Sequence, residues 1–394
     1  MANSALMHTY GRLPVAFAEG KGAWLTDTNG KTYLDALAGI AVCGLGHAHP
    51  AVTQAICDQA NRLVHTSNLY QIPMQEAAAT KLSQLSGMDS VFFCNSGAEA
   101  NEGAIKLARL HGHKKGIDIP HVLVMDNAFH GRTLATLTAT GNRKVQAGFE
   151  PLVSGFVRSS YNNLEAVTNL VERRKDIAAI LIEPVQGEGG LTPATDEFMN
   201  GLRQLCDKHD LLLMLDEVQT GNCRTGYFYA YQRYDWKPDV LTTAKGLGNG
   251  FPIGAVMAQG KAANLFQPGN HGSTYGGTPL GSAVVLAVLE TLEKEQLAKR
   301  AGELGEYLVK RFTESFVDVQ GVKAIRALGL MMGIELDHPC GELVELALNE
   351  GLLINVTAGQ VVRLLPPLTL TDEEAELLIS KLSQLIINWL ASRS

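Results

Sequence analysis

A single lysine lies where an apolar segment gives way to glycines, in DVLTTAKGLGNG at residues 239–250. The segment before it is rich in β-branched side chains and predicts a short buried strand, and the three glycines after it allow a tight turn. Lys245 is therefore expected at the carboxyl end of a strand. An amine at such a position can bond covalently to a carbonyl compound. The alternative is a solvated lysine without a chemical role.

Two acids, Asp216 and Glu217, end the almost wholly apolar segment LLLMLDE at 211–217. A buried carboxylate is costly unless a cation accompanies it, although an acid at an exposed strand end carries no such cost. Asp216 precedes Lys245 by 29 residues (245 − 216), which is enough for one crossover connection between neighbouring strands. We therefore expect that a buried acid and the lysine can share one pocket.

Two polar turns follow other predicted strands. In NSGAEANE at 95–102, backbone N–H groups at a helix start, together with Ser96 and Gly97, suit a phosphate. A serine in this position can also be only a helix cap. In NAFHGR at 127–132, an aromatic ring and an arginine follow a second strand.

A lysine, a buried acid, a phosphate-binding turn and an aromatic ring are together what pyridoxal 5′-phosphate needs. The lysine bonds to the cofactor aldehyde, the acid keeps the pyridine nitrogen protonated, and the ring stacks on the cofactor. Ligands of open α/β sheets bind at the carboxyl ends of the strands, where all four groups are expected. The four signals together predict this cofactor.

The elements that must position these groups follow from the hydrophobic pattern. Helical periodicity alternates with short apolar segments from residue 73 to about 260, which predicts an α/β fold with a mainly parallel sheet covered by helices. Asn29-Gly30 predicts a hairpin between two earlier strands. The expected strands lie at 90–94, 121–126, 177–183, 211–217 and 239–244, the hairpin at 23–35, and helices at 50–64 and 371–391.

Composition excludes several classes of protein. The 394 residues carry a formal charge of −7 without a basic block, so we expect no nucleic-acid partner. The longest apolar segment, 281–292, is shorter than the roughly 18 residues that span a bilayer, so we expect no membrane association. The first 25 residues lack a basic segment followed by an apolar one, which argues against a signal peptide. We expect a cytoplasmic protein.

Metal sites and disulfides are not expected either. The six cysteines show no CxxC spacing, which argues against a zinc ribbon and a redox dithiol. Two His-x-His pairs, at 47–49 and 111–113, lack a third candidate ligand at a recognisable spacing. Surface or capping histidines are the simpler interpretation.

The sequence resembles the class III, fold type I aminotransferases over nearly its whole length. The resemblance begins with YGRLPVAFAEGKGAWLTDTNGKTYLDALAGIAV and continues through NSGAEANEGAIKLAR, FHGRT, EPVQGEGG, LDEVQTG, TTAKGLGNGFPIGA and HGSTYGGTPL to LLINVTAGQVVRLLPPLTLT. The co-occurrence of these motifs in this order is highly specific.

The resemblance implies a role for each residue of the cofactor site. Lys245 is the lysine that bonds to pyridoxal 5′-phosphate, Asp216 contacts the pyridine nitrogen, Gln219 approaches the phenolic oxygen, and Phe129 stacks on the ring. The phosphate ligands that it implies are Ser96, Gly97, Ala98 and, from the neighbouring subunit, Thr274. A homodimer is thereby implied, because each site is incomplete alone.

The resemblance also implies the substrates. Arg132 and Arg363 correspond to the binders of substrate carboxylates, and Glu188 to the acid that screens Arg363. The N-terminal segments and INVTAGQVVRLLPPL favour transfer of the δ-amino group of N2-acetylornithine to 2-oxoglutarate, a step of arginine biosynthesis. Ornithine, succinylornithine, succinyldiaminopimelate and 4-aminobutyrate are the alternative amino donors.

From the hydrophobic pattern we expect a large α/β domain at 66–277, which would bind the cofactor. A smaller α/β domain is expected from both chain ends, at 1–65 and 278–394. Two departures from the family pattern stand out, namely Asn222-Cys223 where relatives more often have Met-Gly, and Thr278 where Asn is frequent.

Two other classes of protein are disfavoured by the sequence. A nucleotide-binding oxidoreductase is disfavoured because GLGNG lacks the GxGxxG spacing. A non-catalytic binding protein on this scaffold would be expected to lack Lys245 or Asp216, and both are present.

Overall fold

A seven-stranded sheet forms the centre of the larger part of the chain, in a computed structural model that describes residues 5–393. Residues 1–4 and 394, which belong to the predicted terminal segments, lie outside the described range. The β12 strand runs antiparallel to both its neighbours, and the other adjacent pairs are parallel, which confirms the prediction of a mainly parallel sheet. The strand order is β4 (Ser90–Cys94), β12 (Gly254–Ala258), β11 (Val240–Thr243), β10 (Leu212–Asp216), β7 (Ile177–Ile182), β5 (His121–Met125) and β6 (Phe156–Ser159).

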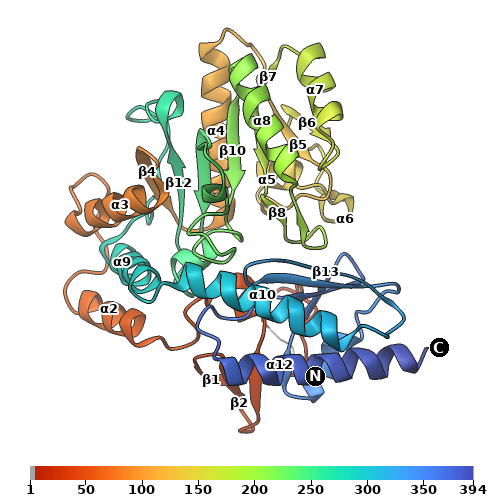
Figure 1. Cartoon of the computed structure of the whole chain (residues 1–394). Coiled ribbons are helices and arrows are strands. Elements are labelled where there is room, and N and C mark those ends of the chain that lie inside the picture. The colour runs from red at the N-terminus through yellow and green to blue at the C-terminus, as the bar shows by residue number, and fades with distance from the viewer. Residues whose placement is uncertain (1–4, 394) are drawn as a thin grey trace.

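Helices cover both faces of this sheet, as Figure 1 shows. Successive side chains of a strand point to opposite faces, so Leu212 and Met214 of β10 pack in the cluster that contains α4 (Gly97–Lys114), whereas Leu213 and Leu215 face the other side. That second face is covered by α7 (Leu164–Arg173), α8 (Asp196–His209) and α9 (Pro279–Lys294). Because both faces are buried, the strands read as continuous apolar segments.

Two four-stranded sheets form the second part of the molecule. In one, the N-terminal strands β1 (Phe17–Lys21), β2 (Trp24–Asp27) and β3 (Thr32–Asp35) are joined by the C-terminal β15 (Leu352–Leu353). The other has the order β13 (Val322–Leu328), β14 (Met331–Leu336), β17 (Val361–Leu364) and β16 (Asn355–Thr357). The helices of this part are α10 (Leu297–Ser315), α11 (Leu343–Asn349) and α12 (Asp372–Ala391).

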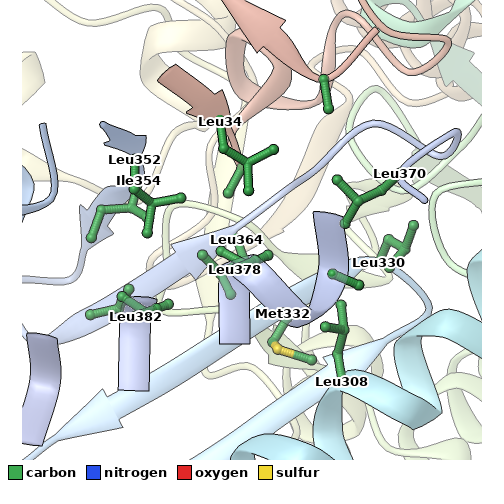
Figure 2. Packing of buried hydrophobic residues seen from close by; sticks show 14 of the residues in the cluster. Leu34, Leu308, Leu330, Met332, Leu352, Ile354, Leu364, Leu370, Leu378 and Leu382 are labelled. Atoms are coloured by element: carbon green, nitrogen blue, oxygen red, sulfur yellow. The ribbon is translucent and has the colours of Figure 1, made fainter. Parts of the chain in front are cut away.

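The two chain ends share one hydrophobic core, which Figure 2 shows from close by. Leu34 of the N-terminal hairpin packs in the same cluster as Leu352, Leu364 and Leu378, more than 300 residues further along the chain. The Trp24 indole also donates a 2.7 Å hydrogen bond to Glu374 of α12. We propose that this core marks the smaller domain, built from 1–65 and 278–394, and that 66–277 forms the larger one.

Shorter elements connect these layers. They are α1 (Ala38–Ala41), α2 (Pro50–Ala60), α3 (Pro73–Ser86), α5 (Leu134–Ala139), α6 (Arg143–Gln146), β8 (Val185–Gln186), β9 (Thr192–Pro193), and the short helices η1 (Ala230–Arg233), η2 (Lys245–Leu247) and η3 (Gly260–Ala262). The helix predicted at 50–64 ends at Ala60, and the one predicted at 371–391 is α12. Within residues 5–393, no helix is both long and apolar enough to cross a bilayer.

Candidate active site

A pocket of about 400 Å³ opens at the carboxyl ends of the central strands. Parallel strands end at the same edge of the sheet, so the turns that follow β4, β5, β7, β10 and β11 meet there. Of the residues predicted from the sequence, those that line the pocket are Ser96, Gly97, Ala98, Phe129, Arg132, Glu188, Asp216, Gln219 and Lys245. The fold thus brings together nine of the eleven predicted site residues.

Lys245 lies two residues after the last residue of β11, with Ala244 between them, and it lines the pocket. Burial lowers the pKa of its amine to about 8, and the nearby Arg363 guanidinium contributes in the same direction. A lysine with this pKa is uncharged in a larger fraction of molecules at neutral pH than an ordinary lysine. The free amine is the form that attacks a carbonyl carbon.

The Asp216 carboxylate is held by three hydrogen bonds at the end of β10. Its Oδ2 accepts from His130 Nδ1 at 2.8 Å and from Asn101 Nδ2 at 2.7 Å, and its Oδ1 accepts from the Val218 N–H at 3.1 Å. The Asn101 carbonyl in turn accepts from Thr242 of the adjacent strand β11. These contacts fix a carboxylate that is only 5% exposed and faces the pocket.

Glu217, the other acid of the pair, is turned away from the pocket. It accepts hydrogen bonds from the N–H groups of Ala230 and Tyr231 and from the Thr220 hydroxyl. Burial raises the pKa of the Glu217 carboxyl to about 7. Glu217 therefore stabilises the start of η1, and Asp216 alone of this pair lines the pocket.

Several polar residues of the pocket were missed by the sequence analysis, among them Asn101, His130 and Glu183. His130 is fully buried and supports Asp216, and Glu183, after β7, accepts hydrogen bonds from the N–H groups of Phe129 at 2.9 Å and Gly187 at 3.4 Å. Burial, followed by the negative charge of Asp216, raises the pKa of the Glu183 carboxyl well above its usual range. Glu183 ends an apolar strand, which is the signal that identified Asp216, and it could have been found in the same way.

The start of α4 supplies a candidate anion site. Ser96 caps the helix, because its hydroxyl accepts a hydrogen bond from the Glu99 N–H at 3.2 Å. The structure thus confirms that Ser96 is a helix cap. The Ser96 O–H can still donate, and Gly97 and Ala98 line the pocket at the first turn, where helix N–H groups lack partners within the helix. A Cβ on Gly97 would lie 2.7 Å from Val218, so the close approach of α4 to the β10 turn requires a glycine.

Two residues that line this pocket have buried polar atoms without partners. Among the described residues, Gln219 Oε1 and His130 Nε2 are buried and have no hydrogen-bond partner. Gly187 leaves space for the Gln219 amide, because a Cβ there would lie 2.3 Å from Oε1. The pocket fits pyridoxal 5′-phosphate. It has a helix start for the phosphate, an acid for the pyridine nitrogen, an aromatic ring, and polar atoms that still lack a hydrogen-bond partner.

The two candidate carboxylate binders differ in their surroundings. The Arg132 guanidinium is exposed and lies 5.8 Å from the centre of the Phe129 ring. Arg363 on β17 is 1% exposed and contacts Glu188 Oε1 at 2.7 Å, and its Nε donates to Asn355 at 3.0 Å. The pocket is therefore lined by the uncovered Arg132 and by Glu188, which pairs with the buried Arg363 behind it; the Glu188 side chain is 42% exposed.

Thr274 is, with Arg363, one of the two predicted site residues that do not line this pocket. It is exposed and does not line the pocket of its own chain. Thr278, the other departure in this region, caps α9 by accepting from the Gly281 N–H at 3.1 Å. An asparagine can form the same cap, so the substitution keeps the turn. Over the described part of the chain, no group of three metal-ligating side chains is found.

The fold and the pocket define a pyridoxal 5′-phosphate-dependent enzyme of fold type I. A family model, "Aminotransferase class-III", matches residues 6–386, and the chain belongs to this family. It is therefore a pyridoxal 5′-phosphate-dependent aminotransferase.

Similar proteins within the family include acetylornithine aminotransferases. The chain is 53% identical to the acetylornithine aminotransferase of Nitrosomonas europaea over 99% of both chains. It is 45% identical to the acetylornithine aminotransferase of Methanothermobacter thermautotrophicus over 97% of this chain and 96% of that one.

Solved structures show the same architecture. The ornithine aminotransferase of Toxoplasma gondii superposes with a TM-score of 0.95 at 33% identity, over 98% of this chain and 94% of that chain. The acetylornithine aminotransferase of Elizabethkingia anophelis gives a TM-score of 0.87 at 33% identity, over 97% and 96%. Since members with different amino donors share the backbone, the fold alone does not select the donor.

Proposed function

We propose that this enzyme transfers the δ-amino group of N2-acetylornithine to 2-oxoglutarate, giving N-acetylglutamate 5-semialdehyde and glutamate in arginine biosynthesis. The observation that carries the proposal is the ion pair of the buried Arg363 with Glu188, a residue of the pocket that also holds Lys245 and the uncovered Arg132. Such a site suits a donor with one carboxylate and an acceptor with two. The names of the similar full-length proteins support the same donor.

Different pocket residues would bind different parts of the cofactor. Ser96, Gly97 and Ala98 would hold its phosphate, and Asp216 would hold the proton on its pyridine nitrogen. When bound, the cofactor takes up the negative charge that develops as the substrate carbon loses its proton. The Lys245 amine, once displaced by the substrate amine, would carry that proton from the terminal carbon of the donor.

The two arginines would bind the two substrates differently. Arg132 would hold the single α-carboxylate of N2-acetylornithine while Glu188 remains on Arg363, so that no second guanidinium is left unpaired. An unpaired buried charge could cost about 3–5 kcal/mol. The α-carboxylate of 2-oxoglutarate would displace Glu188 and bind Arg363 by a two-pronged contact, and Arg132 would take the γ-carboxylate.

The amino donor can be tested with the purified, cofactor-loaded enzyme. We expect N2-acetylornithine to bleach the visible absorption band of the bound cofactor faster than ornithine, succinylornithine, succinyldiaminopimelate or 4-aminobutyrate. Subsequent 2-oxoglutarate should restore the band. A faster reaction with one of the other four donors would replace acetylornithine by that donor and leave the assignment to the aminotransferases intact.

Replacing Glu188 by alanine should change the two half-reactions in opposite directions. Without the Glu188 carboxylate, Arg363 is open to the α-carboxylate of glutamate at all times, so the reaction with glutamate should be faster. The reaction with N2-acetylornithine should slow by about tenfold, because the free guanidinium draws the donor into an unproductive orientation; tenfold corresponds to about 1.4 kcal/mol. Single-turnover absorbance changes measure both rates.

Glu188→Gln is the matched control for the proposed exchange of Glu188 for a substrate carboxylate at Arg363. The amide keeps the size of the side chain and one acceptor but loses the charge, so its effect should fall between those of glutamate and alanine. Equal changes in both half-reactions of Glu188→Ala, or no change in either, would contradict the proposed exchange of partners at Arg363.

We also propose a homodimer in which Thr274 binds the cofactor phosphate of the neighbouring subunit. The exposed position of Thr274, away from the pocket of its own chain, supports this arrangement. Thr274→Val removes the hydroxyl at nearly constant volume and should weaken cofactor retention by about tenfold, which matches the loss of one hydrogen bond of about 1–1.5 kcal/mol. Equilibrium dialysis measures the retained cofactor.

Retention in the Thr274→Val variant should also depend on protein concentration, since the site spans two chains. Thr274→Ser keeps the hydroxyl and should behave as the unchanged protein does. A cofactor-loaded monomer in analytical ultracentrifugation would rule out a phosphate ligand from a second chain.

A further inference from the structure

The backbone at Lys245 has a conformation that needs support. Lys245 has a φ of 45°, in the left-handed region that non-glycine residues rarely adopt. Such a conformation is unfavourable for a residue with a side chain and persists only where the surrounding structure holds it. The direction in which the lysine side chain leaves the backbone therefore depends on the contacts of its neighbours.

Asn222 supplies a side-chain contact to the segment that precedes Lys245. Its Nδ2 donates to the Ala244 carbonyl and to the Thr243 hydroxyl, at 3.2 Å in each case. The carbonyl of Ala244 can only accept, so the NH₂ end of the amide must face it. The same carbonyl also accepts from the Leu247 N–H at 2.9 Å, which closes the turn over Lys245.

Asn222 also packs against the residue that follows Lys245. A Cβ on Gly246 would lie 3.2 Å from the Asn222 Cβ, so the two backbones approach closely. Asn222 is 4% exposed, and it thus contacts the chain on both sides of the lysine from within the protein. Its carbonyl oxygen, Oδ1, is buried without a partner among the described residues.

Asn222 itself lies in a strained turn. Asn222 and Cys223 have φ angles of 56° and 70°, two consecutive non-glycine residues in the left-handed region. Asparagine tolerates this conformation better than most residues, whereas cysteine has no such preference. Both residues share the backbone strain, but only Asn222 hydrogen-bonds to the Lys245 segment in the described structure.

We propose that Asn222 is a positioning residue for Lys245, which fixes the backbone of 243–246 so that the lysine amine meets the cofactor aldehyde and, later, the substrate carbon. This inference rests on Lys245 being the cofactor lysine of the proposed site. It concerns the approach of the lysine and does not depend on which amino donor the enzyme uses.

Asn222→Gly separates the hydrogen bonds from the backbone strain, because glycine accepts the left-handed conformation but lacks the amide. In this variant the covalent attachment of pyridoxal 5′-phosphate to the cofactor-free protein, followed by absorbance, should slow by roughly tenfold to a hundredfold, since small misplacements of reacting groups have effects of this size. The kcat should fall in the same range, and the KM for the donor should stay within about twofold.

Two further variants complete the test. Cys223→Gly relieves the same kind of strain without touching the hydrogen bonds, and its attachment rate and kcat should stay within about twofold of the unchanged protein. Asn222→Asp keeps the shape of the side chain but cannot donate to Ala244, so it should slow attachment as glycine does. It serves as the test if Asn222→Gly does not fold.

Unchanged attachment rates and kcat in both Asn222 variants would overturn the proposal, even if their unfolding temperatures fall, because a purely structural role predicts that pattern. Borohydride reduction of the loaded, unchanged protein, followed by mass spectrometry, shows separately whether the cofactor is bound to Lys245. Failure of that assignment would thus be distinguished from failure of the role of Asn222.

Discussion

Replacing Lys245 by alanine is expected to slow amino transfer by at least about 10⁴-fold, because the variant loses both the covalent attachment of the cofactor and the group that moves the proton. The fold should be retained. Lys245 follows the end of β11 and faces a pocket, so its side chain fills no part of the hydrophobic clusters on either face of the sheet. Steady-state rates and circular dichroism measure the two effects.

The pH dependence of cofactor attachment gives a second measurement on the same residue. Because burial lowers the pKa of the Lys245 amine to about 8, the cofactor-free protein should react with pyridoxal 5′-phosphate increasingly fast as the pH rises, with half of the maximal rate near pH 8. An ordinary lysine would reach that point about two pH units higher.

An exposed lysine provides the control for both measurements. Lys294, in the last turn of α9, is exposed, and Lys294→Ala should leave the activity and the visible absorption band unchanged. A Lys245→Ala variant that keeps the visible absorption band and normal rates would show that another group holds the cofactor.

Replacing Asp216 by asparagine is expected to lower kcat by about 100-fold while some cofactor remains bound. A hydrogen bond to a charged group contributes about 1.5–3 kcal/mol, and the neutral amide cannot hold the proton on the pyridine nitrogen. In either orientation the NH₂ group of the amide meets a donor, because His130 and Asn101 contact Oδ2 and the Val218 N–H contacts Oδ1, so this network must rearrange. Single-turnover kinetics with the donor measure the loss.

His130→Asn tests whether catalysis depends more on the negative charge of Asp216 or on the orientation of its carboxylate. This variant leaves the Asp216 carboxylate in place but removes the ring that orients it, so kcat should fall by less than in Asp216→Asn. If Asp216→Asn reacts at a near-normal rate, the carboxylate does not serve the cofactor nitrogen and the assignment of Asp216 is wrong.

The sequence by itself determined the strands and the turns that carry the site. Lys245, Asp216 and Phe129 each follow an apolar segment, and the parallel arrangement that such segments favour puts their carboxyl ends at one edge. The structure confirms that edge, with Asp216 in register with Thr242 of the strand that leads to Lys245. These features can be predicted from the sequence because each depends on the hydrophobic pattern of a few neighbouring residues.

The tertiary structure alone decided which polar groups support the site. The hydrogen bonds of Asp216 to His130 and Asn101 join residues 86 and 115 positions apart. No periodicity connects such distant positions, because their contact depends on how the layers pack. The hydrogen bond from Asn222 to the backbone before Lys245 likewise joins the segments that follow β10 and β11, two strands that only the fold places side by side.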